Sequence, residues 1–440
     1  MSYVPHTPEE IRSMLEQIGA NSIEELFEAV PAELRRRAGL KLPAPLGERG
    51  LLEYARAQAA QNRGATANSS FLGAGAYQHQ IPALVDALAS RSEFATTYTP
   101  YQAEISQGTL QWIFEFQTLI CQLTGLEVAN ASLYDGASSL AEAVLMALRI
   151  TRRPRVLVSA GVHPHYRQVL NTYLAGNHPE IEVVALAGDG RTELASVGED
   201  FAAVVVQQPN FFGCIEELEP LANTAHAAGA LAISVTAEPL ALALLKPPGA
   251  SGFDVACGEA QSFGVPLSFG GPYVGFLATQ DRHVRQLPGR LIGETADASG
   301  NRGFVMTLTT REQHIRREKA TSNICTNQGL CALRVTIYLA LLGQRGLRQL
   351  AETNLALAHY AQLALARAGL EPVFSAPTFN EFAVRVPDLA RRFDRLVEAG
   401  VLPGVRLDRF DPEHRDQLLV CVTEQNSRAE IDALATELSA

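Results

Sequence analysis

Lysine is the reactive side chain whose scarcity limits the chemistry that this chain can perform alone. The 440 residues contain three lysines, Lys41, Lys246 and Lys319, and the other 33 of the 36 basic residues are arginines. Lysine is normally among the commonest residues, so each candidate for amine chemistry can be considered individually. Lys41 lies in a helical region near the N-terminus, Lys246 follows an apolar helical run, and Lys319 lies in a charged helical pattern. None of them stands where the fold predicted below would need an amine nucleophile.

Three loops carry residue types that bind ligands. Residues 135–139 (Asp-Gly-Ala-Ser-Ser) open a predicted helix, where a phosphate or an ordinary N-cap would use the same side chains. His163 and His165 follow a predicted strand and suit ring stacking, metal binding or simple helix capping. Residues 258–272 form a glycine-dense turn that permits close approach to a ligand or tight packing. Because no third ligand accompanies the histidines and the six cysteines form no CxxC pair, the sequence predicts no metal site.

Two further segments are predicted binding surfaces. Residues 97–108 mix aromatic, proline and uncharged polar groups in a pattern typical of neither a strand nor a helix. Residues 310–328 join a predicted charged helix to a turn rich in Ser, Thr and Asn, which precedes another helix.

The elements that must position these residues follow from apolar periodicity. Apolar runs rich in β-branched residues alternate with helical patterns such as 137–149. The predicted strands are 155–160, 181–186, 201–207, 231–235, 253–256 and 273–278. This alternation predicts an α/β fold with a mostly parallel sheet covered by helices on both faces. In such a sheet, ligands bind beyond the carboxyl ends of the strands, which is where several of these loops lie.

The regions on either side of the predicted sheet are different. Residues 1–65 carry amphipathic helical patterns, including one at 8–18 with Thr7 as its N-cap, and are predicted to form a helical arm. Residues 66–330 form the large α/β domain. Residues 331–440 combine long helical patterns at 332–342 and 352–368 with strands near 379–386 and 417–423 around a helix at 389–399. They predict a small α+β C-terminal domain.

Composition excludes several classes of partner. The net charge of -11 disfavours nucleic acid and anionic membranes, which need clustered basic surface. No apolar stretch reaches the roughly 20 residues that span a bilayer, and residues 1–8 lack a signal pattern. We therefore expect a cytoplasmic protein.

Four residue strings carry a resemblance to a known family. They are 73–77 (Gly-Ala-Gly-Ala-Tyr), 97–108, 263–272 (Phe-Gly-Val-Pro-Leu-Ser-Phe-Gly-Gly-Pro) and 310–328. Together they resemble the amino-terminal half of glycine decarboxylase, the P-protein of the glycine cleavage system, which in many bacteria is a separate chain, subunit 1 or alpha. The resemblance covers most of the chain. It implies the aspartate aminotransferase-like fold (PLP fold type I) of pyridoxal-phosphate-dependent enzymes.

The resemblance also implies that this chain lacks the residues that hold the cofactor. Pyridoxal phosphate is bound as a Schiff base to a lysine and needs an acidic partner at its pyridinium nitrogen. In the family's other half, that lysine precedes a Thr-Phe pair, and the matching position here is Gln261, whose amide forms no imine. The matching strand end places Val235 or Thr236 where the acid would be, and neither carries a negative charge.

The function implied by the resemblance is therefore that of a catalytically degenerate alpha subunit. A homologous beta subunit would hold pyridoxal phosphate covalently, in an α2β2 heterotetramer. The complex would decarboxylate glycine and transfer the aminomethyl group to the lipoyl group of H-protein. The residues expected to line the substrate entrance are Tyr98, Thr99, Pro100 and Tyr101. Those expected to reach the partner's cofactor phosphate are Thr321, Ser322 and Asn323, and those expected in interface ion pairs are Arg311, His314, Arg316 and Arg317.

Two alternatives remain open on the sequence. One is a self-sufficient pyridoxal-phosphate aminotransferase or desulfurase, which the lysine count disfavours. The other is a purely structural or regulatory subunit with no residue in any active site.

Overall fold

The computed structural model describes residues 6–39, 41–65, 68–176 and 179–440 and divides into two compact units, Met1–Arg63 and Gly64–Ala440. The first unit contains α1 (Pro8–Ile18), η1 (Ile23–Phe27), α2 (Ala32–Arg37) and α3 (Glu48–Ala59), and none of these helices has a buried residue. Thr7 caps α1 in a reciprocal capping box with Glu10. The predicted helix and its N-cap are therefore confirmed.

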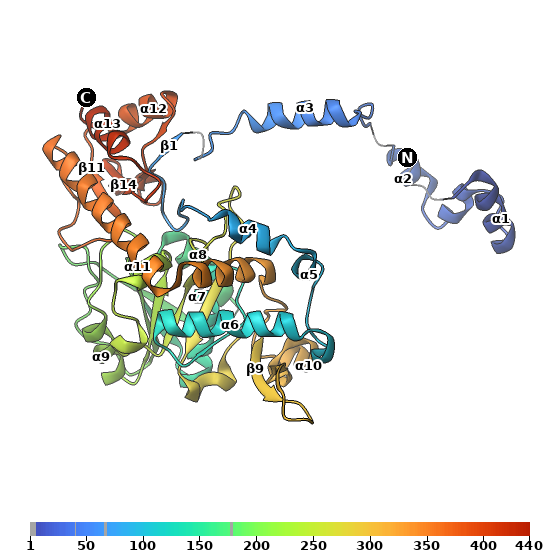
Figure 1. Cartoon of the computed structure of the whole chain (residues 1–440), viewed down its shortest axis with the longest axis horizontal. Coiled ribbons are helices and arrows are strands. Elements are labelled where there is room, and N and C mark those ends of the chain that lie inside the picture. Colours follow the sequence, from blue (N-terminus) through green and yellow to red (C-terminus); the bar gives the residue numbers. More distant parts are fainter. Residues whose placement is uncertain (1–5, 40, 66–67, 177–178) are drawn as a thin grey trace. The chain divides into compact units, whose positions relative to one another are not determined.

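The second unit (Gly64–Ala440; Figure 1) is built around a seven-stranded sheet with the order β2-β8-β7-β6-β5-β3-β4. The strands are β2 (Val128–Ala129), β3 (Arg155–Ser159), β4 (Glu180–Val184), β5 (Phe201–Gln207), β6 (Leu231–Thr236), β7 (Val255–Glu259) and β8 (Gly275–Thr279). Neighbouring strands from β3 to β7 pair in parallel, whereas β8 runs antiparallel to β7, and β2 to β8. All six predicted strands are present, with ends displaced by at most three residues. The mostly parallel sheet is thus confirmed.

Side chains of each strand alternate between two apolar layers, because successive residues of a strand point to opposite faces. Val156 and Val158 of β3 pack with α7 (Gly136–Thr151) and α8 (Pro164–Leu174). Leu157, between them, packs on the other face with α9 (Leu218–Ala227). Since both faces are covered, the strands read as continuous apolar runs.

Two long helices, α6 (Gln107–Thr124) and α11 (Gly329–Arg367), pack together with α4 (Ala83–Ala89). The helical patterns predicted at 332–342 and 352–368 belong to one element, which is kinked at Gly343 (φ 58°). By length and composition, α11 passes as a membrane-spanning helix, the one candidate in the part of the chain that the structure describes. It packs against α4, α6 and α13 (Arg428–Ser439), as a core helix does.

One predicted helix is wrong, and one hairpin was not predicted. The charged segment near 310–319 forms only the single turn α10 (Gln313–Arg316), flanked by short 3₁₀ turns. Arg317 ends the turn with a left-handed φ of 53°, which a continuing helix does not allow. Just before this segment, β9 (Leu291–Ala296) and β10 (Arg302–Thr307) form an antiparallel hairpin.

The C-terminal part of the second unit contains the predicted strands and helix. Antiparallel β11 (Glu381–Arg385), β14 (Gln417–Cys421) and β13 (Val405–Arg406) share an apolar core with the end of α11, α12 (Leu389–Glu398) and α13. β1 (Ser69–Ser70) pairs in parallel with β12 (Val401–Leu402), and the Cys421 N–H donates to the Phe71 carbonyl. Residues 69–71 therefore lie beside the C-terminal sheet.

Candidate functional site

The candidate site lies where the carboxyl ends of the parallel strands meet the N-terminus of α7. In doubly wound sheets this edge is the usual place for ligands. Residues 73–79, which we call the strap, lie across this edge and contact residues that follow β3, β6 and β7. The chemistry of the site therefore depends on what lies between the strand ends and the strap.

Glu259, the last residue of β7, occupies the start of α7. Its side chain is buried, and one carboxyl oxygen accepts the Gly136 N–H at 3.0 Å. The other oxygen accepts the N–H groups of Ala260 (3.0 Å), Gln261 (3.2 Å) and Val274 (2.9 Å). Burial raises the pKa of Glu259 to about 8, although the backbone donors oppose the shift.

The first turn of α7 is tightly packed and capped. The Asp135 carboxylate accepts the Ser138 N–H at 2.7 Å, and the Ser138 hydroxyl accepts the Asp135 N–H. Of the two alternatives for 135–139, this is the ordinary N-cap. A Cβ on Gly136 would lie 2.3 Å from the Tyr166 hydroxyl, and one on Gly275 would lie 2.3 Å from the Asp135 carbonyl oxygen. Neither position has room for a side chain.

Gln261 lies buried beneath the strap, with its amide fully used. Its carbonyl oxygen accepts the Tyr77 N–H at 2.9 Å, and its amide nitrogen donates to the carbonyl oxygens of Tyr77 (3.1 Å) and Val265 (2.7 Å). No lysine of the described residues reaches this place, since Lys246 is exposed and pairs with Glu219.

His163 is a packed, neutral imidazole. Its Nε2–H donates to the Ala74 carbonyl, and its Nδ1 accepts the His165 N–H. The ring stacks on Tyr166 with centroids 5.0 Å apart. Burial lowers the pKa of His163 to about 4. Because both ring nitrogens are occupied, ring stacking and capping describe this residue. No group of three potential metal-binding side chains occurs among the described residues.

A buried ionic triad ties the strap to residues that follow β6 and β14. His79 lies 3.0 Å from Glu238 through Nε2 and 2.9 Å from Glu424 through Nδ1. The two carboxylates raise the pKa of His79 to about 10 against the effect of burial. Val235 and Thr236, at the end of β6, are buried. The acid nearest to them, Glu238, is held by His79. Sequence reasoning missed this triad because its members are far apart in the chain.

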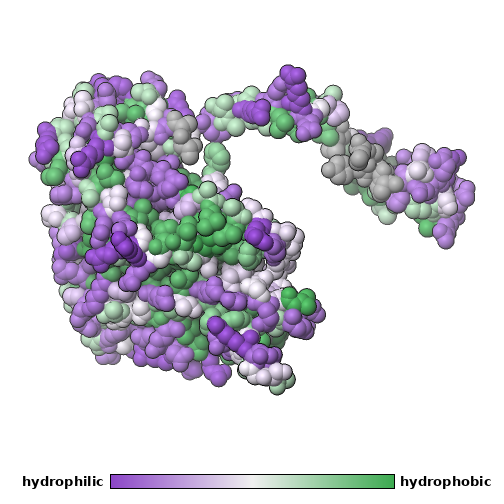
Figure 2. All heavy atoms as spheres, viewed as in Figure 1, coloured by the Kyte–Doolittle hydropathy of each residue, from purple (hydrophilic) through white to green (hydrophobic). Residues whose placement is uncertain are grey.

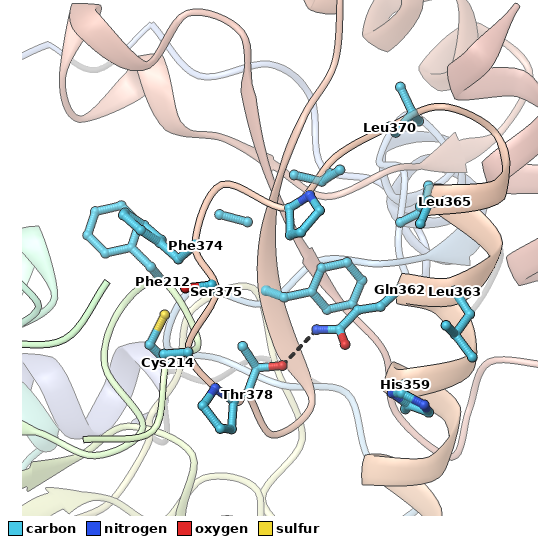
Figure 3. Close-up of a pocket in the computed structure, with 17 residues that line it drawn as sticks. Phe212, Cys214, His359, Gln362, Leu363, Leu365, Leu370, Phe374, Ser375 and Thr378 are labelled. Atoms are coloured by element: carbon cyan, nitrogen blue, oxygen red, sulfur yellow. Dashed lines mark hydrogen bonds between the residues drawn. The ribbon is translucent and has the colours of Figure 1, made fainter. Parts of the chain in front are cut away.

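Little space remains under the strap. A cavity of about 10 Å³ lies between Tyr77, Asn210, Glu238 and Glu381, which is close to the volume of one water probe. A larger cleft of about 360 Å³ lies between α11 and the C-terminal sheet (Figure 3). Its lining is mostly apolar, and Gln362 of α11 donates to the Thr378 hydroxyl there at 2.8 Å. No residue that the sequence singled out lines this cleft.

The aromatic segment predicted to line a substrate entrance is largely on the surface. Tyr98 is 86% exposed and Tyr101 is 59% exposed, while Thr99 is half-buried and Pro100 is buried. Arg290 lies 5.7 Å from the centre of the Tyr101 ring and donates to the Cys325 carbonyl. The structure therefore brings the 97–101 segment close to the 310–328 segment.

The four basic residues predicted to form interface ion pairs differ in their surroundings. Arg311 donates to the carbonyls of Leu308, Leu287 and Gly289, so its guanidinium is directed inward rather than toward a partner. His314 packs edge-on against Tyr101, with centroids 5.9 Å apart. His314 Nδ1 also lies 3.7 Å from a Glu312 carboxyl oxygen. Arg316 and Arg317 are exposed, and neither makes an ion pair with another described residue. Arg316 and Arg317 are thus the ones available to a partner.

Thr321, Ser322 and Asn323 border a separate open cleft of about 640 Å³. Its lining includes Arg149 and Arg153 but also the carboxylates Glu142 and Glu318. Both Arg149 and Glu142 belong to the later turns of α7, so the cleft is distinct from the pocket at the start of that helix.

Large apolar side chains are exposed near these segments. Figure 2 shows apolar residues gathered over α4 and the first half of α11. The exposed set includes Tyr98, Tyr101, Ile105, Phe269, Ile315 and Leu330, which we call the apolar rim. Phe269 is 89% exposed on a turn with four consecutive left-handed residues, 268–271. The Cys331 thiol contacts the Pro272 carbonyl, which joins this turn to the start of α11. Large exposed apolar side chains are often found on interaction surfaces.

The fold defines a class of protein. A mouse CSAD structure (15% identity, TM-score 0.66) covers 93% of this chain and 91% of its own. A sphingosine-1-phosphate lyase from Burkholderia pseudomallei (17% identity, TM-score 0.65) covers 93% and 94%. At these identities the likeness concerns the fold alone, which is that of type I pyridoxal-phosphate enzymes, as predicted.

Closer relatives then show the family. The family model described as glycine cleavage system P-protein matches residues 1–438. A crystal structure of glycine decarboxylase (P-protein) of the glycine cleavage system, in inhibitor-bound form, is 49% identical with a TM-score of 0.91, covering 100% of this chain and 99% of that one. The probable glycine dehydrogenase (decarboxylating) subunit 1 of Moorella thermoacetica is 51% identical (100% and 99% coverage), and that of Desulforamulus reducens is 48% identical (100% of both). This chain belongs to the glycine cleavage system P-protein family and corresponds over its whole length to members named subunit 1.

Proposed function

We propose that this chain is the alpha subunit of a pyridoxal-phosphate-dependent glycine decarboxylase and is inactive alone. A homologous beta subunit holds the cofactor covalently, in an α2β2 assembly in the cytoplasm. The complex decarboxylates glycine and passes the aminomethyl group to the lipoyl group of H-protein. Neither nucleic acid nor a membrane is a partner.

The observation that carries this proposal is the state of Gln261. Its amide makes three hydrogen bonds under the strap, and the pocket around it has no lysine. The full-length similarity to proteins named subunit 1 supports a second chain that supplies what this one lacks. A self-sufficient aminotransferase would need the amine that is absent here.

The apolar rim supports a role at an interface. Tyr98, Phe269 and Ile105 are more than three-quarters exposed, and a partner chain would remove them from water. When bound in the partner, pyridoxal phosphate supplies the electron sink for decarboxylation. This chain contributes a wall of Tyr98 and Tyr101, which excludes water and bulky substrates, since glycine offers no side chain to grip.

Polar groups of this chain have a second role in the proposal. Thr321, Ser322 and Asn323 carry hydroxyl and amide donors at an exposed or half-buried turn, where the Ser322 hydroxyl would have to exchange its hydrogen bond with Glu142 for one with the phosphate. We assign them to hydrogen bonds with the phosphate of the partner's cofactor. Arg316 and Arg317, whose guanidinium groups face solvent, pair with carboxylates of the partner.

Reconstitution tests the function. The chain is purified alone and together with a lysine-bearing homologous chain, and glycine–bicarbonate exchange and the cofactor absorbance spectrum are measured on each sample. We expect exchange and cofactor colour only in the two-chain complex. A yellow isolated chain with a reducible imine would support the aminotransferase alternative instead. An active complex that tolerates loss of both Tyr98 and Tyr101 would support a purely structural subunit.

A further inference from the structure

We propose that Glu259 is a built-in substitute for a phosphate group, and that together with the strap it closes this chain's own cofactor pocket. In this inference the pocket accepts neither pyridoxal phosphate nor inorganic phosphate. This pocket lies within this chain, whereas the proposed function concerns the active site of the partner.

The N-terminus of α7 is already occupied by side chains of this chain. At the start of a helix such as the 16-residue α7, the first N–H groups lack partners within the helix and the dipole is positive, and enzymes bind phosphate at such places. Here the Gly136 N–H donates to Glu259 and the Ser138 N–H donates to Asp135. Two carboxyl groups of the chain thus take the donors that a phosphate would use.

The contacts around the Glu259 carboxyl group resemble those around a bound anion. All four groups that touch its carboxyl oxygens are backbone N–H donors, drawn from α7, from the turn after β7 and from the start of the next strand. Such a ring of N–H groups is the kind of nest that binds anions. Its centre is filled by a side chain that is 2% exposed.

The space beside the start of α7 is restricted by aromatic side chains. The Tyr166 hydroxyl lies where a Cβ of Gly136 would be, and the His163 ring stacks on Tyr166. A phosphate bound at this helix N-terminus would have to approach Glu259 and Asp135, and Tyr166 leaves little room beside Gly136. At pH values above the pKa of Glu259, about 8, its negative charge would repel a phosphate strongly in this buried site.

The strap is held over the pocket by several hydrogen bonds. The side-chain amide of Gln261 accepts the Tyr77 N–H and donates to the Tyr77 carbonyl oxygen. Ala74 donates to Glu381 at 2.6 Å and accepts from His163. Gly73 and Gly75 allow this approach, since a Cβ on Gly73 would lie 2.1 Å from a Glu381 oxygen. Opening the pocket would break all these contacts together.

The test compares wild type with Glu259→Ala at pH 8.5, above the pKa of about 8 to which burial raises this group. The thermal midpoint is measured in sodium chloride, sodium formate and sodium phosphate at equal ionic strength, and pyridoxal phosphate uptake is measured by equilibrium dialysis. Glu216→Ala is the matched control. Glu216 is also buried and accepts bonds from Thr192 and Asn210; although it precedes the N-cap of α9, its carboxyl group accepts no N–H of that helix among the described residues.

We expect formate and phosphate to shift the wild-type midpoint only by a general, non-saturable salt effect, with no pyridoxal phosphate retained in the pocket. Glu259→Ala should unfold several degrees lower in chloride, and formate and phosphate should each restore part of the loss in a saturable way. Glu216→Ala should show no such specific recovery.

Two results would overturn the inference. One is stoichiometric retention of pyridoxal phosphate or phosphate by the wild-type chain, with a raised midpoint. The other is a Glu259→Ala chain whose midpoint does not respond to either anion. If that variant does not fold, Glu259→Gln replaces it. The amide keeps the shape but not the charge, so its midpoint should be lower than that of wild type, and an unchanged midpoint would count against the inference. Because these measurements need only the isolated chain, their outcome is independent of whether the partnered complex decarboxylates glycine.

Discussion

Replacing His79 should be one of the most destabilising single changes in the second unit. Its side chain is 2% exposed and bridges Glu238, which is 3% exposed, and Glu424, which is 12% exposed. His79→Ala leaves both carboxylates buried without their shared cation. Removing one partner of a buried ion pair costs about 3–5 kcal/mol, chiefly because the remaining charge is uncompensated. We expect a loss of that size, and part of it should return in His79→Ala/Glu424→Gln, because the second change removes one of the stranded charges.

The pH dependence of this loss has a defined sign. The pKa of His79 is raised from 6.5 to about 10 in the folded chain, so its stabilisation is complete below 6.5 and disappears as the pH rises toward 10. The pKa of Glu424 is lowered from 4.5 to about 2, mainly by His79 against the effect of burial, so its stabilisation is complete above 4.5 and disappears toward 2. The difference between wild type and His79→Ala should therefore be largest between pH 4.5 and 6.5.

Guanidinium unfolding provides the assay. The single tryptophan, Trp112, is buried in α6 and reports the second unit by its fluorescence. Because a chain of this size need not unfold in two states, unfolding midpoints are compared rather than free energies. They are measured at pH 5.5 and at pH 9.5. His359→Ala, an exposed histidine on α11, is the control and should change stability by no more than about 0.5 kcal/mol. A His79→Ala midpoint within error of wild type at pH 5.5, or a difference that grows toward pH 9.5, would refute the reasoning.

Three further predictions concern function. Gln261→Lys alone should give no glycine-dependent CO2 release by the isolated chain, because no acid lies free beside the new amine and the pocket is filled; robust release would contradict this. Thr321→Ala/Ser322→Ala should weaken cofactor retention by the complex by roughly 1.5–3 kcal/mol for each lost charge-assisted bond, and dialysis that finds wild-type retention would count against the assignment. Tyr98→Ala and Tyr101→Ala should leave the complex assembled in sizing chromatography while exchange falls greatly, because the proposed role of these side chains is to wall the partner's substrate site and not to hold the chains together. Failed assembly would mean that they only pack the interface, and an assembled, fully active double variant would reject both roles.

The sheet could be predicted from sequence because its pattern is local. Fully buried strands such as β5 are continuous apolar runs, and their period and length survive without knowledge of any partner. The helix predicted at 310–319 is wrong for the opposite reason, because contacts with distant residues decide the backbone there. Its composition favours a helix, but Arg311 is drawn inward by the carbonyls of Leu308, Leu287 and Gly289, and the backbone reverses at Arg317. Tertiary contacts overrode propensity there.

The candidate site was only partly predictable. The scarcity of lysine and the amide at Gln261 are visible in the sequence and already argue that the chain needs a partner. Glu259 gave a weak signal, a charged residue between an apolar strand and a glycine-rich turn, but nothing in that pattern says that its carboxyl group enters the first turn of α7.

By itself, the sequence determined the alternation of strands and helices, the identity of the residue at the end of each strand, and the chemistry that those residues lack. The tertiary structure alone decided which of them meet. Glu259 lies 123 residues from Gly136, and His79 lies 159 residues from Glu238 and 345 from Glu424. Such partners are set by the register of the sheet and by the path of the strap between two sheets. A periodic pattern reports which face of an element is buried, but not which distant group will lie against it.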